Sequence, residues 1–358
     1  MRVLMVGACP FPTSQGSQVY MGAQARALAA AGVSLRLLTY GHGEERSSAD
    51  YEHIRLPMLP GYRSLRSGPH PAKLLLDGVL FQYLMRLEAD LFHAHNYEAA
   101  LICGAVGRLR GIPVLYDAHG ILSEELPTYF PEGAQLRRRG AALVGAAVDR
   151  RLAGLDGVIA ISAEGERRLR HLGARRLWRI PPGVDPDEYR DLSPPAAAVP
   201  TVVYAGNPDA YQDLPLLFEA MRLVPGLRLR LVTHTRAWQL PSFLQPELYL
   251  VQGWEEARAA IASAWVAALP RRSCPGFPIK LLNYLGLGVP TVISRGSAQG
   301  LPGELPVEPE PAAFAAALLA AVERPPPPFQ QQFLAENAWD RRVQDILAVY
   351  RTLLAPKP

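Results

Sequence analysis

The chain has 358 residues, 49% of them hydrophobic and 20% charged, so it can bury a large core, and its length is typical of two domains. A net charge of +4 suits a protein that binds nucleotides, phosphorylated substrates or anionic lipid. Nucleic-acid binding is less expected, because the sequence has no basic stripe with interleaved aromatic residues. Cys9, Cys103 and Cys274 lack C-x-x-C spacing, which argues against a disulfide framework or a zinc site and favours a reducing cytoplasm. No apolar run approaches membrane-spanning length.

The first half alternates short apolar runs with helical stretches. The predicted strands are Val3–Gly7, Ser34–Thr39, Leu91–Ala94, Val114–Asp117 and Gly157–Ile161. The predicted helices are Tyr20–Ala31, Tyr97–Leu109 and Gly140–Leu152. This alternation predicts a parallel sheet with helices on both faces. No G-x-G-x-x-G follows the first strand, so the nicotinamide-binding fingerprint is absent.

A proline-rich stretch without periodicity, residues 181–200, predicts a linker, and the pattern then restarts. The predicted strands are Thr201–Tyr204, Leu227–Val232, Leu248–Val251, Ala264–Leu269 and Thr291–Ser294. The predicted helices are Leu214–Leu223, Glu255–Ser263, Ile279–Leu287, Ala312–Val322 and Asp340–Leu354. Ligands of open α/β sheets bind outside the carboxyl ends of the strands, so two such halves predict a cleft between two sheets.

The segment PGFPIKLLNYLGLGVP, residues 275–290, is the most informative one in the chain. It predicts a Gly/Pro loop, a helix from Ile279 and a turn into a buried strand. The first N–H groups of a helix have no internal partners, and the helix dipole adds positive charge there. Gly276 lets the backbone approach a ligand, and Lys280 adds a full charge in the first turn. The segment therefore predicts an anion site, best suited to a diphosphate.

Motifs along most of the chain resemble the retaining GT-B glycosyltransferases of the family 4 type. They comprise PFPTSQGSQVYMGAQARALAAAGVSL, ADLFHAHNYEAA, GIPVLYDAHGILSEEL, VIAISAEGERRLRHLGA, RIPPGVDPDEY, VVYAGNPDAYQDLPLLFEAM and PGFPIKLLNYLGLGVPTVIS, in the family's order. The resemblance implies an α/β fold of GT-B architecture, with two Rossmann-like doubly wound domains facing a central cleft. Residues 1–182 would bind the acceptor, residues 183–339 would bind the nucleotide sugar, and the helix in 340–358 would cross back to the N-terminal domain.

The resemblance also implies an activity: transfer of a sugar, with retention, from a nucleotide diphosphate sugar to a glycan, lipid-linked or small-molecule acceptor. His119 matches the family's active-site histidine, which contacts the donor sugar. The donor-binding candidates are Gly16, Gly206, Asn207, Gly276, Phe277, Pro278, Ile279, Lys280 and Asn283. The acceptor-side candidates are Ser14, Gln15, His95 and Glu124. The sequence does not identify the base or the sugar of the donor, the acceptor or the oligomeric state.

Two departures from the family pattern keep other functions open. The family commonly has a Glu before its GF pair and a second Glu eight residues later, where this chain has Pro275 and Asn283. The usual Arg and Lys after the first strand of the C-terminal domain are also missing, so Lys280, helped by Arg271 or Arg272, is the remaining partner for a diphosphate. A noncatalytic GT-B protein that binds a nucleotide sugar or acts as a scaffold is one alternative. A GT-B-like sugar epimerase is the other.

We expect no metal and no cofactor besides the donor. His93 and His95 lie two apart and face the same side of a strand, but no third ligand with suitable spacing is evident. The resembling family often uses lipid-linked acceptors. Basic-apolar stretches around Arg137–Arg139 and Lys73–Leu87 could dock on an anionic membrane or pack into the core. We therefore expect a cytoplasmic protein, with peripheral contact to the inner face of the cell membrane left open.

Overall fold

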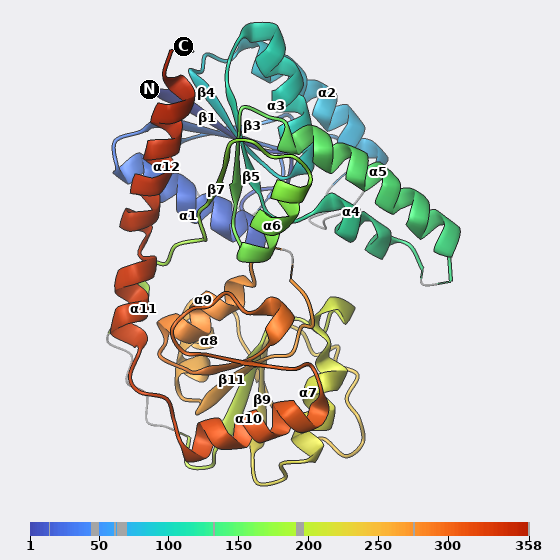
Figure 1. The fold of residues 1–358 in the computed structure, drawn as a ribbon, viewed down its shortest axis with the longest axis vertical. Helices are drawn as coiled ribbons and strands as arrows, with labels where there is room; N and C mark the ends of the chain where they lie inside the picture. Colours follow the sequence, from blue (N-terminus) through green and yellow to red (C-terminus); the bar gives the residue numbers. More distant parts are fainter. Residues whose placement is uncertain are drawn as a thin grey trace. The chain divides into compact units, whose positions relative to one another are not determined.

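A computed structural model of the chain describes residues 1–13, 15–43, 50–60, 62, 70–131, 133–190, 197–274 and 276–356. The chain divides into two compact units (Figure 1). The first contains Met1–Gly183 and Trp339–Pro358, together with Gly276 and Phe277. The second contains Val184–Cys274 and Pro278–Ala338. The C-terminal segment thus belongs to the same unit as the N-terminus.

The first unit is built on a seven-stranded parallel sheet with the order β3-β2-β1-β4-β5-β6-β7. Its strands are β1 (Arg2–Gly7), β2 (Ser34–Thr39), β3 (Glu52–Arg55), β4 (Leu91–His95), β5 (Val114–Ala118), β6 (Gly157–Ala160) and β7 (Leu177–Arg179). β1, β4 and β5 are almost entirely buried, as expected for central strands covered on both faces. The order reverses between β1 and β4, which is the switch point where open sheets bind ligands.

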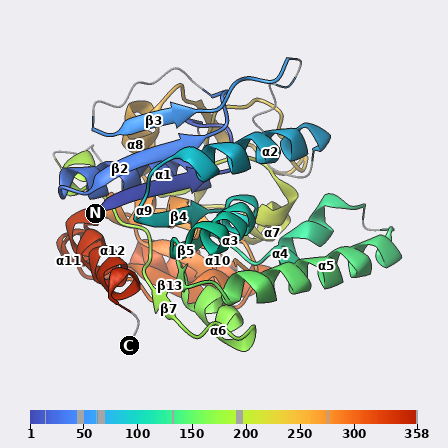
Figure 2. The ribbon, with the colours of Figure 1, turned by 90° about the horizontal axis from the view of Figure 1, so that it is seen from above.

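Helices cover both faces of this sheet. On one face lie α2 (Pro71–Arg86), α3 (Tyr97–Arg110) and α5 (Gln135–Ala153), and their apolar side chains join the core cluster under β1, β4 and β5. Figure 2 shows α12 (Trp339–Leu354) on the opposite face, where it packs against α1 (Gly16–Ala30). The remaining helical segments are α4 (Leu122–Glu125), η1 (Leu126–Tyr129) and α6 (Ala163–His171).

The second unit has a six-stranded parallel sheet with the order β10-β9-β8-β11-β12-β13. Its strands are β8 (Thr201–Ala205), β9 (Arg228–Thr233), β10 (Glu247–Leu250), β11 (Val266–Leu269), β12 (Thr291–Ser294) and β13 (Glu304–Val307). Its helices are α7 (Leu214–Arg222), α8 (Trp254–Ala262), α9 (Ile279–Gly286), α10 (Pro311–Glu323) and α11 (Gln330–Asn337). Single-turn segments are η2 (Pro186–Tyr189), η3 (Ala210–Gln212) and η4 (Arg295–Ser297). The prediction of two Rossmann-like parallel-sheet domains is confirmed.

Several element boundaries differ from the sequence prediction. α1 begins at Gly16 rather than at Tyr20, and α5 begins at Gln135 rather than at Gly140, so both helices gain a polar or basic first turn. Three strands were missed, namely β3, β7 and β13. They are short, and each lies at or next to a sheet edge, where polar residues replace a continuous apolar run. No helix in the described ranges is both long and apolar enough to span a bilayer.

Candidate functional site

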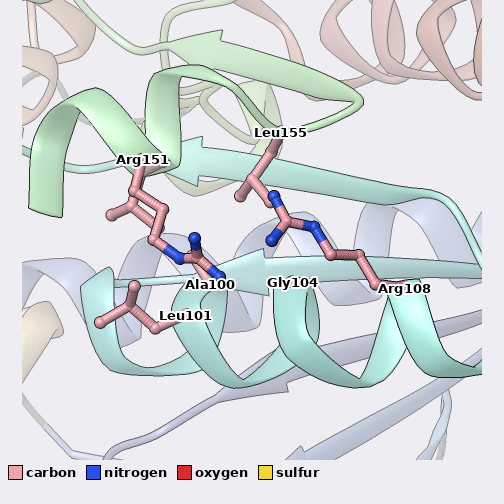
Figure 3. A pocket seen from close by; sticks show the side chains of 7 residues that line it. Ala100, Leu101, Gly104, Arg108, Arg151 and Leu155 are labelled. Atoms are coloured by element: carbon pink, nitrogen blue, oxygen red, sulfur yellow. The ribbon is translucent and has the colours of Figure 1, made fainter.

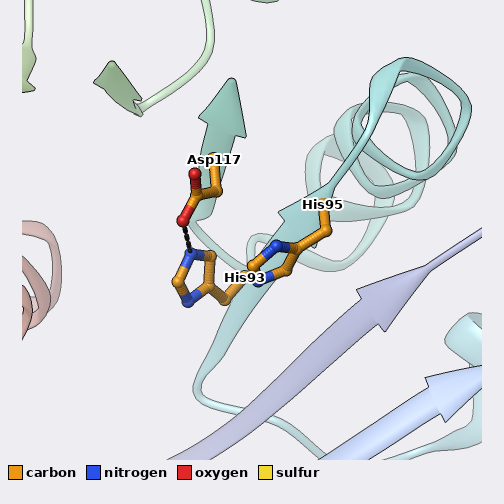
Figure 4. A group of neighbouring side chains, drawn as sticks. All are labelled: His93, His95 and Asp117. Atoms are coloured by element: carbon orange, nitrogen blue, oxygen red, sulfur yellow. Dashed lines mark ion pairs between the residues drawn. The ribbon is translucent and has the colours of Figure 1, made fainter. Parts of the chain in front are cut away.

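A polar cluster lies at the carboxyl ends of β4 and β5 in the first unit. The two strands are neighbours, and their register places His95 opposite Asp117. His93 and His95 point to the same side of β4, with ring centroids 4.8 Å apart. Figure 4 shows the imidazole of His93 directed at the carboxylate of Asp117, with the ring of His95 beside it. His93, His95 and Asp117 have at most 1% of their surface exposed, so the cluster lies beneath the end of the sheet.

Asp117 is the anion at the centre of the cluster. Its Oδ2 atom accepts hydrogen bonds from the hydroxyl of Tyr20, at 2.8 Å, and from the amide of Gln24, at 3.0 Å. Nε2 of His93 faces the same oxygen at 3.5 Å. Burial alone would raise the pKa of Asp117, but the interaction with His93 and the attraction between the carboxylate and the protonated forms of the three imidazoles outweigh burial and lower it. The carboxylate is therefore ionised at neutral pH.

His119 follows β5 and forms the outer layer of the cluster. Its Nε2 atom lies 2.9 Å from Nδ1 of His95 and 3.9 Å from Oδ1 of Asp117. Its side chain is 15% exposed. Burial lowers the pKa of His119 and, more strongly, that of His95, although the charge of Asp117 opposes both shifts. Both imidazoles are therefore neutral at neutral pH, and the buried His95 can act on a ligand only through His119.

Three residues of the cluster are of the types that bind metal ions. The ligand atoms of His93, His95 and Asp117 lie within 4.8 Å of one another. The sequence shows no third ligand with suitable spacing, but strand pairing brings Asp117 beside the two histidines and corrects that expectation. Nδ1 of His93, Nδ1 of His95 and Oδ2 of Asp117 take part in hydrogen bonds, whereas Nε2 of both histidines and Oδ1 of Asp117 have no hydrogen-bond partner among the described residues. Metal independence stays a prediction.

The other candidates of the first unit lie at the start of α1 and in α4. Gln15 precedes α1, its N–H donates to Oγ1 of Thr13, and Gly16 is the exposed first residue of the helix. Ser14 lies outside the described residues. Glu124 forms an ion pair with Arg168 at 3.1 Å, which leaves it less available for an acceptor. Its neighbour Glu125 accepts hydrogen bonds from the hydroxyls of Tyr97 and Tyr129.

Lys280 is the centre of the candidate site in the second unit. Its Nζ atom donates to the hydroxyl of Tyr204 at 2.9 Å and to Oε1 of Gln212 at 3.2 Å, and it lies 4.2 Å from the centroid of the Tyr204 ring. Burial and the charge of Arg271 lower the pKa of Lys280 to about 7. Gly206 has φ +137°, and a Cβ there would lie 2.7 Å from Nζ. The glycine therefore leaves the space in which the ammonium group sits.

Two arginines follow β11, and their surroundings differ. Arg271 stacks over the ring of Tyr211, with Cζ 4.9 Å from the ring centroid, and its charge acts on Lys280. Arg272 is turned to Asp213, which accepts from its backbone N–H at 2.8 Å. Of the two sequence candidates, Arg271 is thus the one that adds a second cation beside Lys280. Asn207, one residue after Gly206, has a buried Oδ1 atom without a hydrogen-bond partner.

Asn283 and the loop before α9 complete the predicted donor residues. Oδ1 of Asn283 accepts from the hydroxyl of Tyr189 at 3.1 Å, so the amide NH₂ is the group left for a ligand. Pro278 precedes α9 and Ile279 is its first residue. Gly276 and Phe277 are grouped with the first unit, where a Cβ on Gly276 would lie 2.3 Å from the backbone oxygen of His119. Pro275 lies outside the described residues.

Sequence reasoning missed five polar partners of these sites. They are Tyr20, Gln24, Tyr350, Tyr204 and Gln212. Tyr20 and Gln24 are four residues apart on α1, a helical spacing that places both on one face, and this was the available signal. No local spacing could have indicated Tyr350, which lies 257 residues after its partner His93.

A small hollow between α3 and α5 is a separate feature of the first unit. Figure 3 shows Arg108 and Arg151 extending over it from the two helices. Its free volume of about 10 Å³ is close to that of a single water site. It cannot hold a nucleotide.

Comparisons with known proteins agree with the fold and the motifs. The family model described as Glycosyltransferase Family 4 matches residues 14–188, and the one described as Glycosyl transferases group 1 matches residues 199–324. No curated protein matches the chain.

Solved structures resemble the chain over nearly its whole length. Sucrose-phosphate synthase from Thermosynechococcus elongatus is 20% identical, with 99% of each chain covered and a TM-score of 0.78. Anabaena HepE in complex with UDP and glucose is 14% identical, with 98% of this chain and all of that one covered and a TM-score of 0.71. An α,α-trehalose-phosphate synthase from Burkholderia xenovorans in complex with glucose-6-phosphate is 15% identical, with 97% and 99% covered and a TM-score of 0.68. The two family models together span most of the chain, which therefore belongs to the group 1, family 4 glycosyltransferases of GT-B fold.

Proposed function

We propose that the protein is a retaining glycosyltransferase that takes a sugar from a nucleotide diphosphate sugar and transfers it to a carbohydrate-bearing acceptor. The observation that carries this proposal is the environment of Lys280. Its ammonium group lies over Gly206, in the first turn of α9, with Arg271 as a second cation nearby. Two cations and the free N–H groups of a helix start form a site suited to a diphosphate. HepE, of the same fold, has been crystallised with UDP and with UDP-glucose.

The residues have separate tasks in this reaction. Lys280 and Arg271 stabilise the negative charge that develops on the leaving diphosphate, and the amide of Asn283 hydrogen-bonds the ribose. His119 orients the donor sugar. The bond from the anomeric carbon to the diphosphate oxygen breaks while the acceptor oxygen bonds the same face of the sugar. The acceptor's proton passes to the diphosphate, so no protein nucleophile is needed, and positioning and charge stabilisation account for the catalysis.

The replacement of two family carboxylates supports a second candidate, a noncatalytic protein that binds a nucleotide sugar. Asn283, already engaged by Tyr189, offers a ligand its amide donor where a carboxylate would accept. A GT-B-like epimerase is the third candidate, and it needs well-placed acid and base groups. The three candidates differ in what they do to the donor: transfer needs an acceptor, epimerisation does not, and a binding protein leaves the donor intact.

A proton NMR assay of donor consumption distinguishes them. Purified protein is incubated with UDP-glucose, GDP-mannose, ADP-glucose or dTDP-glucose, with and without glucose 6-phosphate or a membrane lipid extract as acceptor. We expect one donor to be consumed only when an acceptor is present, giving a product with the anomeric configuration of the donor. His119→Ala should abolish this turnover, whereas the exposed His171→Ala should not. Consumption without an acceptor would support the epimerase, and an inverted product would contradict retention.

We further propose that the protein is cytoplasmic and touches an anionic membrane through α5. Leu136, Leu143 and Val144 on this helix are 85%, 74% and 60% exposed, and Arg137 and Arg139 lie on the same outer face. Exposed apolar residues among arginines suit an anionic lipid surface. Sedimentation with phosphatidylglycerol vesicles should be reduced by Leu143→Ser with Val144→Ser. Equal binding of the variant, or equal binding to uncharged phosphatidylcholine vesicles, would contradict this contact.

A further inference from the structure

The buried cluster of the first unit contains three imidazoles around one carboxylate, and the position of each proton decides what His119 can do. A neutral imidazole has one nitrogen that donates and one that accepts. His119 is reached by His95 at Nε2, and no hydrogen bond from the described residues reaches its Nδ1 atom. Whether Nδ1 donates or accepts toward a substrate therefore follows from the state of Nε2.

The charge of Asp117 makes the two tautomers of His119 unequal in energy. An ionised carboxylate only accepts hydrogen bonds. Tyr20 and Gln24 both donate to Oδ2, which fixes the carboxylate from the side of α1. Oδ1 is buried without a hydrogen-bond partner and lies 3.9 Å from Nε2 of His119. A proton on Nε2 is attracted by this oxygen, whereas a lone pair there is repelled, and the low dielectric of a buried site strengthens both effects.

His95 is compatible with a proton on Nε2 of His119. Its Nδ1 atom can accept from His119 or donate to it, at 2.9 Å in either case. Its Nε2 atom is buried without a partner in both arrangements. That atom is an unpaired N–H when Nδ1 accepts and an unpaired lone pair when Nδ1 donates, so neither arrangement satisfies it, and we take the charge of Asp117 as the deciding interaction.

The charge of Asp117 also determines which nitrogen of His93 carries the proton. Its Nε2 atom faces Oδ2 of Asp117, so Nε2 carries the proton. Nδ1 of His93 then accepts from the hydroxyl of Tyr350 on α12, at 2.7 Å. The C-terminal helix thus holds the imidazole of His93, and α1 holds the carboxylate, from the same face of the sheet.

We propose that Asp117 is a positioning residue that holds His119 with its proton on Nε2, so that Nδ1 accepts a hydrogen bond from a hydroxyl of the donor sugar. The identity of the ligand depends on the proposed function, whereas the tautomer does not. In this state His119 cannot donate through Nδ1 to a sugar oxygen. A sugar that presents only an acceptor at that point, such as a deoxy-fluoro analogue, should bind more weakly than the hydroxyl form.

Long-range proton–nitrogen NMR correlation on protein labelled with ¹⁵N at histidine tests the tautomer without any substrate. EDTA is added so that no metal ion occupies the cluster, and the His119 signals are assigned as those lost in His119→Gln. We expect His119 at pH 7.5 to show a protonated Nε2 and an unprotonated Nδ1. Protonation at Nδ1 in the wild-type protein would overturn the proposal. Because the wild-type spectrum decides, the test does not depend on a variant that folds.

Three variants separate the role of Asp117 from general packing. Asp117→Asn removes the charge with little change in shape, and we expect the two His119 nitrogen signals to move toward each other as the second tautomer becomes populated. Tyr350→Phe should move the signals of His93 and leave the His119 tautomer unchanged, and His171→Gln should change neither. A His119 signal unaffected by Asp117→Asn would overturn the proposal. Nucleotide binding is measured separately, so failure of the donor assignment and failure of the tautomer are told apart.

Discussion

The hydroxyl of Tyr350, near the end of the chain, lies 2.7 Å from Nδ1 of His93, on a central strand near the beginning. Both groups are buried, and 257 residues separate them. Tyr350 lies on α12, whose apolar residues Val343, Ile346 and Val349 are also buried in the first unit. The last helix is therefore attached both by apolar packing and by a specific hydrogen bond to the polar cluster.

Replacing Tyr350 by Phe should destabilise the first unit. The change leaves the buried Nδ1 atom of His93 without a partner, which costs about 1–3 kcal/mol. Thr352→Ala, on the exposed face of the same helix, is the matched control and should change the free energy of unfolding by about 0.5 kcal/mol or less. Urea unfolding measures both. Equal stability of the two variants would show that the bond to His93 contributes nothing.

Diphosphate binding should weaken as the pH rises through the pKa of Lys280. That pKa is lowered to about 7 by burial and by Arg271, and only the protonated amine attracts an anion. With a pKa of about 7, the dissociation constant for UDP should rise about fivefold between pH 7 and pH 8. Lys280→Met should bind weakly with little change over this range. A wild-type affinity independent of pH would contradict the lowered pKa.

Lys280 also makes the free energy of unfolding depend on pH, and its lowered pKa sets the direction of that dependence. The pKa of Lys280 is 10.5 in an ordinary environment, so between pH 7 and pH 10 the unfolded chain binds more protons at this site than the folded chain. The contribution of Lys280 to the free energy of unfolding therefore increases with pH across that window. The wild-type stability curve should rise relative to that of Lys280→Met. Parallel curves would show that the site does not disfavour the charged amine.

Gly206→Ala should weaken nucleotide binding more than it lowers stability. A side chain at φ +137° is strained, at a cost of about 1–3 kcal/mol, and its Cβ would push Nζ of Lys280 from its place 2.7 Å away. Gly226→Ala is the control, because nothing lies within 4 Å of a Cβ there. Thermal unfolding and UDP titration measure the two effects. Unchanged nucleotide affinity would separate Gly206 from the donor site.

The sequence predicted the elements whose signals are local. Helix α9 was expected at Ile279–Leu287 and runs from Ile279 to Gly286, because Pro278 precedes it and the Gly-Val-Pro turn ends it. The edge strand β3, with the sequence EHIR, was missed because two charged residues and a histidine interrupt its apolar pattern. Strands that pair only at an edge need less burial, and so carry less of the signal that sequence patterns detect.

The sequence indicated individual site residues, but not which of them come together in the folded protein. His93, His95 and His119 each stood out, whereas Asp117 was only the end of a predicted strand, and their gathering depends on β4 pairing with β5, which linear spacing does not specify. The preference for Arg271 over Arg272 likewise depends on contacts with Tyr211 and Asp213. Neighbouring residues point in different directions, and only the structure shows that the charge of Arg271 acts on Lys280.

The proposed donor site is tested most directly by calorimetric titration with UDP, GDP, ADP and dTDP. The account predicts selective binding of one nucleotide by the wild-type protein, weakened by Lys280→Ala, Arg271→Ala and Asn283→Ala. Arg272→Ala, whose side chain turns to Asp213, should bind as the wild type does. Failure to bind any of the four nucleotides, or undiminished binding by Lys280→Ala, would contradict the assignment of the donor site to Lys280 and α9.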